Sequence, residues 1–292
     1  MLRKVHKHGI GDAFFDIFNV IILGIIALVT VLPFIHVIIA SFTPPEELLK
    51  TEFILFPKRI SLEAYRYIFS TNVVIRGLII SVFVTAIGTI FNMIMTVLMA
   101  YPLAHKKLMG RKAVMLMVTF TLMFNGGMVP SYIIIQKLHL LNNYWSLILP
   151  GAISAFSLII FKNYFQELPK ELEESAKLDG ANDLIILMRI ILPISMPLIA
   201  TFLVMFGVGY WNSWFNAVLY LNDAKMWPIQ VVLRQVIAST SNIGDMMESN
   251  IVIQPKTVQM CTITIATLPI LCVYPFLQKY FTQGMLLGSV KG

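Results

Sequence analysis

The stretch GLIISVFVTAIGTIFNMIMTVLMAYPLA, residues 77 to 104, contains no acidic or basic side chain. About 20 consecutive apolar residues suffice for a helix to cross a bilayer. In the hydrocarbon core only helices and closed barrels satisfy their backbone hydrogen bonds. The stretch therefore predicts a transmembrane helix, and it sets the fold class of the whole chain.

Five further apolar stretches flank it along the chain. They run roughly over residues 17–41, 113–135, 144–161, 193–221 and 258–277. The composition agrees, because 58% of the 292 residues are hydrophobic and only 13% are charged, with a mean hydropathy of +0.80, whereas soluble domains are about a quarter charged. We expect an all-α membrane protein with six transmembrane helices in one domain, residues 17–281.

One of the six predicted spans contains helix-breaking residues. Asn125, Gly126, Gly127 and Pro130 interrupt the stretch 113–135. Such a break is tolerated in a membrane only where protein or water covers the freed backbone groups. We therefore expect a broken helix or a re-entrant turn at this point.

The basic residues of the short segments predict the orientation. Arg3, Lys4 and Lys7 lie in the tail 1–16, and the loop HKKLMGRK, residues 105–112, has four basic residues and no acid. Positive segments stay in the cytoplasm, so both termini and the segment 166–193 are expected there, with 43–73 and 222–256 outside. The apolar stretch after the tail is too long for a signal peptide and is expected to be retained as the first span.

Few side chains in the spans are suited to chemistry. The spans contain His36 but no Asp, Glu, Lys or Arg. Ion-coupled transporters normally have such ionisable residues inside the membrane to relay protons or bind ions, so the sequence does not indicate a transporter of that class. His36 is expected to be structural or interfacial.

The two cysteines are not placed to form a disulfide. Cys261 and Cys272 are eleven residues apart in one predicted helix, a distance of roughly 16 Å, which is too long for a disulfide. We expect both to be inert core residues. No metal-ligand set is recognisable, and the net charge of +7 fits basic loops beside a membrane better than nucleic-acid binding.

The segment PKELEESAKLDGANDLIILMRIILP, residues 169–193, predicts two short helices joined by a bend. Pro169 suits a helix start, and acidic residues follow it in the first turn. Gly180 suits a stop, and a second helix is expected from about Asn182 to Ile191. Ser175, Ala176 and Ala181 are small, so another surface can approach closely. The segment is either a docking site or a solvated surface hairpin.

The same segment resembles the EAA loop of permease subunits of bacterial ATP-binding-cassette (ABC) importers, EAA-x3-G-x9-I-x-L-P. Glu174, Ala176, Gly180, Ile190, Leu192 and Pro193 match in residue and spacing, and Ser175 replaces the first alanine. The resemblance implies the type I importer permease fold and a coupling helix docked on a separate ATPase. The residues it assigns to coupling are Glu174, Ser175, Ala176, Asp179, Gly180 and Ala181.

Other stretches narrow the resemblance to carbohydrate permeases of the maltose-transporter type. SFTPPEE at 41–47, the pair Trp211-Asn212 and the C-terminal YFTQGMLLGSVKG at 280–292 are similar to segments of that family, and MFNGGMVPSYIII at 123–135 resembles its aldouronate or complex-polysaccharide branch. The resemblance implies a second homologous permease, two ATPase subunits, an extracellular solute-binding protein and an oligosaccharide substrate. It also implies that the tail 282–292, with Gly284, Gly288 and Lys291, contacts the ATPases.

Nucleotide binding is expected on the partner rather than on this chain. No G-x-x-x-x-G-K-[ST] loop occurs, so the sequence lacks the cradle that holds nucleotide phosphates. We expect a non-catalytic subunit in a bacterial plasma membrane that binds no cofactor itself, with ATP and Mg²⁺ used by the ATPase.

Aromatic and amide residues suggest where a sugar would pass. Aromatic faces suit sugar C–H groups and amides suit hydroxyls; the candidates are Asn125, Tyr210, Trp211, Asn212, Trp214 and Asn216. The alternative is that the aromatics are interfacial anchors and the amides bond between helices, as we expect for Asn92. The stretch 228–237, with Arg234, is either a helix lying on the membrane or a contact for the binding protein.

Two other function classes remain as alternatives. An ABC permease for peptides or polyamines is disfavoured by the Trp211-Asn212 pair and the C-terminal tail. A membrane-embedded enzyme would need a cluster of His, Asp or Glu near the spans, and none is visible.

Overall fold

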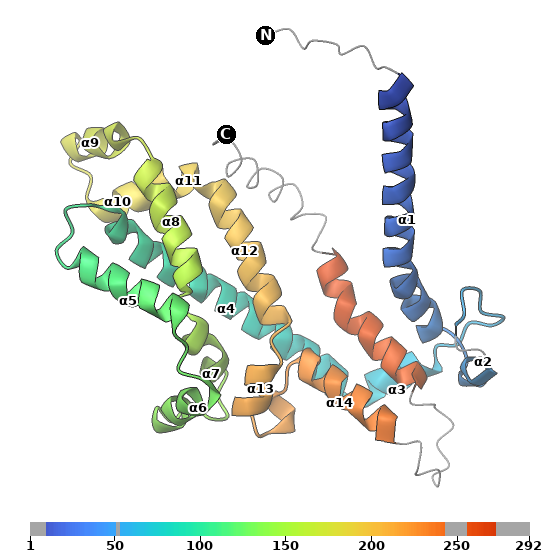
Figure 1. Ribbon diagram of the computed structural model, residues 1–292. Coiled ribbons are helices and arrows are strands. Elements are labelled where there is room, and N and C mark those ends of the chain that lie inside the picture. The colour runs from blue at the N-terminus through green and yellow to red at the C-terminus, as the bar shows by residue number, and fades with distance from the viewer. Residues whose placement is uncertain (1–9, 51–52, 243–255, 273–292) are drawn as a thin grey trace. The chain divides into compact units, whose positions relative to one another are not determined.

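The computed structural model describes residues 10–50, 53–242 and 256–272. Within these residues the regular structure is helical, as the composition predicts (Figure 1). The first helices are α1 (Ile10–Ser41), α2 (Pro45–Lys50), α3 (Glu63–Ser70), α4 (Val73–Ala104), α5 (Arg111–Met123), α6 (Met128–Lys137), α7 (Trp145–Ile148) and α8 (Ala155–Glu167). They are followed by α9 (Lys170–Leu178), α10 (Asp183–Ile186), α11 (Leu192–Ile194), α12 (Met196–Trp211), α13 (Phe215–Tyr220), α14 (Ile229–Asn242) and a last helix, Lys256–Cys272.

The helices form two compact units. One unit comprises residues 1–70 and 236–265, and the other comprises residues 71–235 and 266–292. The larger second unit contains the predicted coupling segment and all the predicted pathway residues.

Length and hydropathy mark two helices as candidate spans, Phe15–Ser41 and Val73–Ala104. Two bent pairs raise the number to four if each pair is one span. Trp145–Gly151 and Ala155–Glu167 meet at 51°, and Asp183–Ile194 and Met196–Trp211 meet at 83°. Lys256–Cys272 is a shorter apolar helix whose predicted span continues beyond the described residues. The full count of six spans and the location of the termini stay predictions.

The predicted break in the span 113–135 is present. α5 ends at Met123 and α6 begins at Met128. Asn125 helps to form the break, because its Oδ1 accepts a hydrogen bond from Gly127 N at 2.9 Å.

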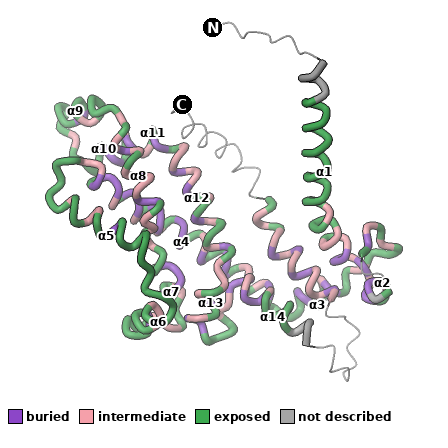
Figure 2. The backbone as a smooth tube through the Cα atoms, viewed as in Figure 1, coloured by how far each residue is buried: buried purple, intermediate pink, exposed green. Residues whose placement is uncertain are grey.

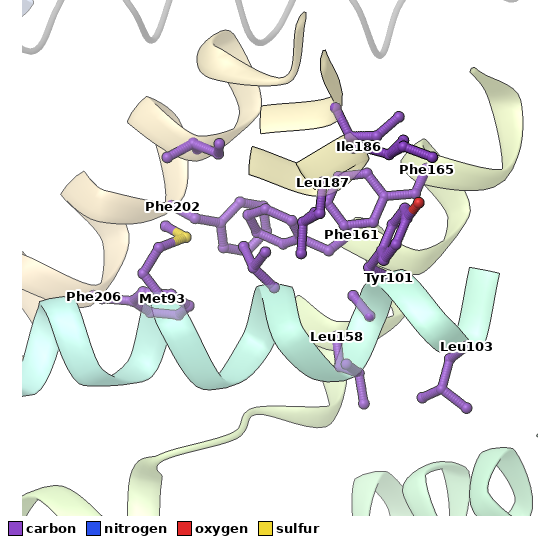
Figure 3. Close-up of a cluster of buried hydrophobic side chains, with 14 of the residues drawn as sticks. Met93, Tyr101, Leu103, Leu158, Phe161, Phe165, Ile186, Leu187, Phe202 and Phe206 are labelled. Atoms are coloured by element: carbon purple, nitrogen blue, oxygen red, sulfur yellow. The ribbon is translucent and has the colours of Figure 1, made fainter. Parts of the chain in front are cut away.

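The core of the second unit lies between α4, α8 and α12. Aromatic rings from α8 and α12 pack together there, with the Phe161 and Phe202 centroids 5.0 Å apart (Figure 3). Phe161 and Leu158 are fully buried, and Met93 and Val97 of α4 close the same cluster. Within this unit, α4 is therefore the central element, and α7, α8 and α12 pack against it.

Opposite ends of α4 hold two different segments of the unit. At its N-terminal end, Ser81 Oγ accepts a hydrogen bond from Ile229 N of α14 at 2.9 Å. Past its C-terminal end, His105 contacts Glu173 of α9 at 2.8 Å. Ser81 and His105 are about 24 residues apart, roughly 36 Å at helical rise, which is comparable to the thickness of a bilayer. Figure 1 shows α9 and the start of α14 at these two ends.

The first unit contains α1, whose side chains from Phe15 to Ile21 are all exposed within this chain (Figure 2). His36 is structural, as expected: its ring stacks on Phe53 with centroids 4.6 Å apart, and its Nδ1 lies 3.1 Å from Ile54 O.

The two cysteines differ in environment. Cys261 is buried and its thiol donates to Ser41 O at 3.1 Å, as expected for a core residue. Cys272 is exposed in this chain, so the prediction that both cysteines are core residues is wrong for Cys272. The periodicity of one helix does not determine which of its faces meets a neighbour.

Candidate functional site

The segment 169–193, called here the EAA-like segment, begins with α9 and a glycine stop. Gly180 has φ +81°, the left-handed conformation that glycine adopts without a Cβ penalty. Gly180 N donates to Lys177 O at 3.1 Å and Ala181 N donates to Ala176 O at 2.9 Å. This pair of bonds is a Schellman motif, which satisfies the last carbonyls of α9 and turns the chain sharply.

The second half of the segment starts with a side-chain cap. Asn182 Oδ1 accepts from Ile185 N at 2.9 Å and so caps α10. The next five residues, Leu187–Ile191, form a π-helix that continues into α11. The predicted second helix therefore exists, but its middle is wound more widely than an α-helix.

An ion pair spans the bend. Lys177 Nζ lies 3.0 Å from Asp183 Oδ1 across Gly180. This hydrogen bond raises the pKa of Lys177, so the lysine is charged over the physiological range. Both side chains are about half exposed or more, so the pair orients the bend rather than contributing much stability.

The exposed face of the EAA-like segment combines acids with bare apolar side chains. Glu174, Ser175 and Asp179 are exposed, and Leu178 is 90% exposed. Leu184 and Met188 are also exposed, at 60% and 59%. Exposed apolar side chains beside acids are typical of surfaces that bind another protein.

The small residues of the segment do not all serve that face. Ala176 is 8% exposed and packs into the core cluster of its own unit. The small size of Ala176 therefore lets α9 approach the core, and its side chain is not part of the exposed face. Gly180 remains exposed, while Ala181 is half-buried beside the cluster.

The EAA-like segment meets α4 at a fully capped helix end. The last four carbonyls of α4 have no partner within the helix, and each is satisfied from outside. His105 Nδ1 lies 3.0 Å from Tyr101 O and His105 N donates to Pro102 O. Arg111 Nε donates to Leu103 O at 2.8 Å, and Gln166 Nε2 donates to Ala104 O at 2.9 Å.

This junction was missed from the sequence. The loop 105–112 was interpreted only as a positive segment that sets orientation. Its first residue also lies directly after a helix, where His, Lys or Arg side chains bond the last carbonyls. That signal identifies a cap, but it does not reveal that Glu173, 68 residues away, meets the same histidine.

Two of the predicted pathway aromatics pack in one cluster. Tyr210 and Trp214 contact buried residues around Ile80, Leu147 and Tyr220. The guanidinium of Arg234 lies over the Trp214 ring at 3.4 Å, so one face of that indole is occupied.

Trp211 is placed elsewhere. It is buried, and its indole nitrogen donates to Ala266 O at 3.3 Å. It also lines a groove of about 390 Å³ with α4 residues such as Val82 and Thr85. Apart from Thr85 the lining is apolar, which does not suit a hydroxylated solute, so Trp211 has a packing role in this structure.

The predicted pathway amides divide by exposure. Asn125 and Asn212 are exposed and Asn216 is half-buried. Asn212 Nδ2 donates to Val208 O at 3.0 Å, at the end of its own helix. Asn92 is buried, and in the described part of the chain its Oδ1 has no hydrogen-bond partner. The Asn92 side chain is instead a hydrogen-bond partner of the Tyr210 hydroxyl on α12, which agrees with the expected bond between helices.

The predicted tail contacts Gly284, Gly288 and Lys291 lie outside the described residues.

Comparison with known proteins agrees with this arrangement. Residues 74–287 match the family model described as binding-protein-dependent transport system inner membrane component. The chain is 52% identical over 282 residues to the polygalacturonan/rhamnogalacturonan transport system permease protein YtcP of Bacillus subtilis, covering 94% of this chain and 99% of that one. It is 49% identical to protein LplC of the same organism, covering 100% and 99% of the two chains.

A solved structure has the same fold. It is a bacterial ABC transporter involved in the import of the acidic polysaccharide alginate, with a TM-score of 0.87 and 29% identity, covering 95% of this chain and 100% of that chain. With a family model matching most of its length and a helical fold shared with an ABC importer, this chain belongs to the family of binding-protein-dependent transport system inner membrane components.

Proposed function

We propose that this chain is the membrane-spanning permease subunit of an ABC importer for oligosaccharides, coupled through its EAA-like segment to a separate ATPase. The observation that carries the proposal is the EAA-like segment itself: an exposed acidic and apolar face on a glycine-bent helix pair, bonded directly to the end of the central helix α4. Movement of an ATPase bound to this face would therefore be transmitted directly to α4.

The oligosaccharide class is supported by the named relatives. YtcP is named for polygalacturonan and rhamnogalacturonan, a third relative of 28% identity is named for arabinooligosaccharides, and the structural neighbour imports alginate. These names favour a sugar over the alternative of a peptide or polyamine. The exposed amides Asn125 and Asn212 are the groups we assign to the sugar pathway.

The topology follows from the two ends of α4. With the EAA-like segment on the cytoplasmic face, where an ATPase acts, Ser81 and the start of α14 lie toward the outer face of a bacterial plasma membrane. Arg234 is then on the side where a solute-binding protein delivers substrate.

The importer also needs a second permease in this proposal. Helix α1 is apolar and exposed along most of its length within this chain, which suits burial against lipid or another subunit. We propose a heterodimeric pore over two ATPases, because the maltose-type carbohydrate permeases that the sequence resembles pair two related permeases. A homodimer would instead need one surface that complements itself.

The test is purification of the tagged chain with the products of neighbouring genes, followed by uptake in proteoliposomes containing ATP. The expected result is an ATPase and a second permease in the complex, and ATP-dependent uptake of oligogalacturonides or arabino-oligosaccharides. A stable homodimer that transports without a second permease contradicts the heterodimer, and uptake of peptides or polyamines instead contradicts the sugar assignment.

A further inference from the structure

One histidine joins the EAA-like segment to the end of α4. His105 Nδ1 lies 3.0 Å from Tyr101 O, and Nε2 lies 2.8 Å from Glu173 Oε2. A backbone carbonyl only accepts hydrogen bonds, so Nδ1 carries a proton in this contact. An ionised carboxylate also only accepts, so Nε2 carries a second proton. An imidazolium therefore satisfies both contacts at once, whereas a neutral ring satisfies only one of them.

The local field suits a charged ring. His105 follows the C-terminus of α4, where helix carbonyls concentrate negative potential and stabilise a cation. The Tyr101 ring is edge-on to the imidazole with centroids 5.0 Å apart. The His105 and Glu173 side chains are 34% and 21% exposed, so solvent screens the pair only in part.

The other charged groups near this junction are already engaged or point elsewhere. Arg111 Nε is bonded to Leu103 O, and Lys177 is paired with Asp183. Asp183 and Glu173 are the acids that act electrostatically on Tyr101. Lys106 and Lys107 follow His105 in the loop and are exposed. Glu173 is therefore the acid available to His105.

We propose that His105, acting as an imidazolium, is the positioning residue that makes α9 and α4 move together during transport. This inference rests on the proposed function, because it concerns how the EAA-like segment passes ATPase movement to the membrane domain. Ala176 of α9 packs into the core through an apolar contact, and apolar contacts have no preferred direction. A charge-assisted hydrogen bond between an imidazolium and a carboxylate has a preferred direction, and such a bond is short and strong.

The first experiment compares variants of the pair in the intact complex with its ATPases and binding protein. In His105→Gln and Glu173→Gln, we expect the ATPase to co-purify at the wild-type level. The stimulation of ATP hydrolysis by the binding protein should fall by roughly tenfold, which is the effect expected from the loss of one charge-assisted hydrogen bond. Because the two residues act as a unit, the double variant should be no worse than either single one. Additive losses in the double variant, or wild-type stimulation in both singles, overturn the proposal.

The second experiment uses pH, because a purely structural histidine would not give a charge-dependent readout. Histidines change charge between about pH 5 and 8, and the imidazolium is the low-pH form. Stimulation, normalised to the unstimulated rate, should therefore fall from acidic to alkaline pH in the wild type. In His105→Arg, which stays charged, stimulation should be retained and the fall abolished.

His139 provides the matched control. It is an exposed loop histidine, and within the described residues no ring hydrogen bond is recorded for it. His139→Gln should keep the wild-type pH profile. The same fall in His105→Arg as in the wild type overturns the role of the imidazolium.

These readouts separate the inference from the proposed function. Absence of sugar uptake with normal stimulation contradicts only the sugar assignment, while unaltered stimulation in the His105 and Glu173 variants contradicts only the inference. Failure of the wild-type chain to bind any ATPase contradicts both.

Discussion

The ring of Tyr210 occupies the space that a side chain at Gly88 would need. A Cβ added to Gly88 would lie 2.7 Å from Cε1 and Cζ of Tyr210. α4 and α12 approach closely at this point, and Tyr210 Oη also reaches Ile148 O at 3.5 Å. The glycine in the middle of a span is therefore a packing residue between two helices, as small residues in membrane interfaces commonly are.

Gly88→Ala should destabilise the complex by about 1–3 kcal/mol, because the ring cannot move aside without disturbing its neighbours. The measurement is the thermal unfolding midpoint in detergent. Gly209→Ala is the matched control, since a Cβ there meets nothing within 4 Å. Adding Tyr210→Leu to Gly88→Ala should recover part of the loss, and equal midpoints for Gly88→Ala and Gly209→Ala would contradict this packing role.

Gly180→Val should uncouple transport while leaving the chain in the membrane. The space around Gly180 is open, so the cost is backbone strain at φ +81°, on the order of 1–3 kcal/mol, which re-aims α10 relative to α9. The measurement is sugar uptake together with ATPase co-purification. Gly180→Asn is the control, because asparagine tolerates the left-handed region. Wild-type uptake in Gly180→Val would remove the bend from the coupling mechanism.

Glu174→Ala should weaken the contact with the ATPase without affecting the fold of this chain. Glu174 is exposed and makes no recorded side-chain contact in the described part of the chain, in contrast to Glu173. We expect reduced ATPase co-purification and unchanged thermal stability of the permease. Unchanged co-purification would identify Glu174 as a solvated acid.

Asn212→Leu should lower sugar uptake while ATPase stimulation by the binding protein persists. The change removes an exposed amide and buries nothing, so its effect on stability is expected to be below about 0.5 kcal/mol. Asn92→Leu is the comparison, because Asn92 is buried between helices and its substitution should alter stability rather than uptake. Normal uptake in Asn212→Leu would remove this residue from the pathway.

Deletion of residues 288–292 should reduce transport with membrane insertion intact, if the tail enters the ATPase dimer as the family resemblance implies. Uptake and membrane-fraction immunoblotting are the measurements. Transport at the wild-type level would mean that the tail is a frayed terminus.

The sequence by itself determined the helical membrane class, the helix break at Asn125 to Gly127 and the stop at Gly180. These features depend on residues close together in the sequence. The hydropathy of a segment determines whether it lies in lipid or in water, and a glycine allows the backbone to turn at the end of a helix. The EAA-like spacing also identified the segment 169–193, because motif residues close in sequence share one short helix pair.

Only the tertiary structure decided which face of each helix is used. Ala176 turned out to face the core of its own unit, Cys272 is exposed, and Trp211 donates to Ala266 O 55 residues away. The His105–Glu173 pair joins residues 68 positions apart, and the Gly88–Tyr210 approach joins two spans. A hydropathy pattern cannot distinguish these outcomes, because in an apolar helix all faces are similarly hydrophobic and only packing against a specific neighbour determines which residue meets which.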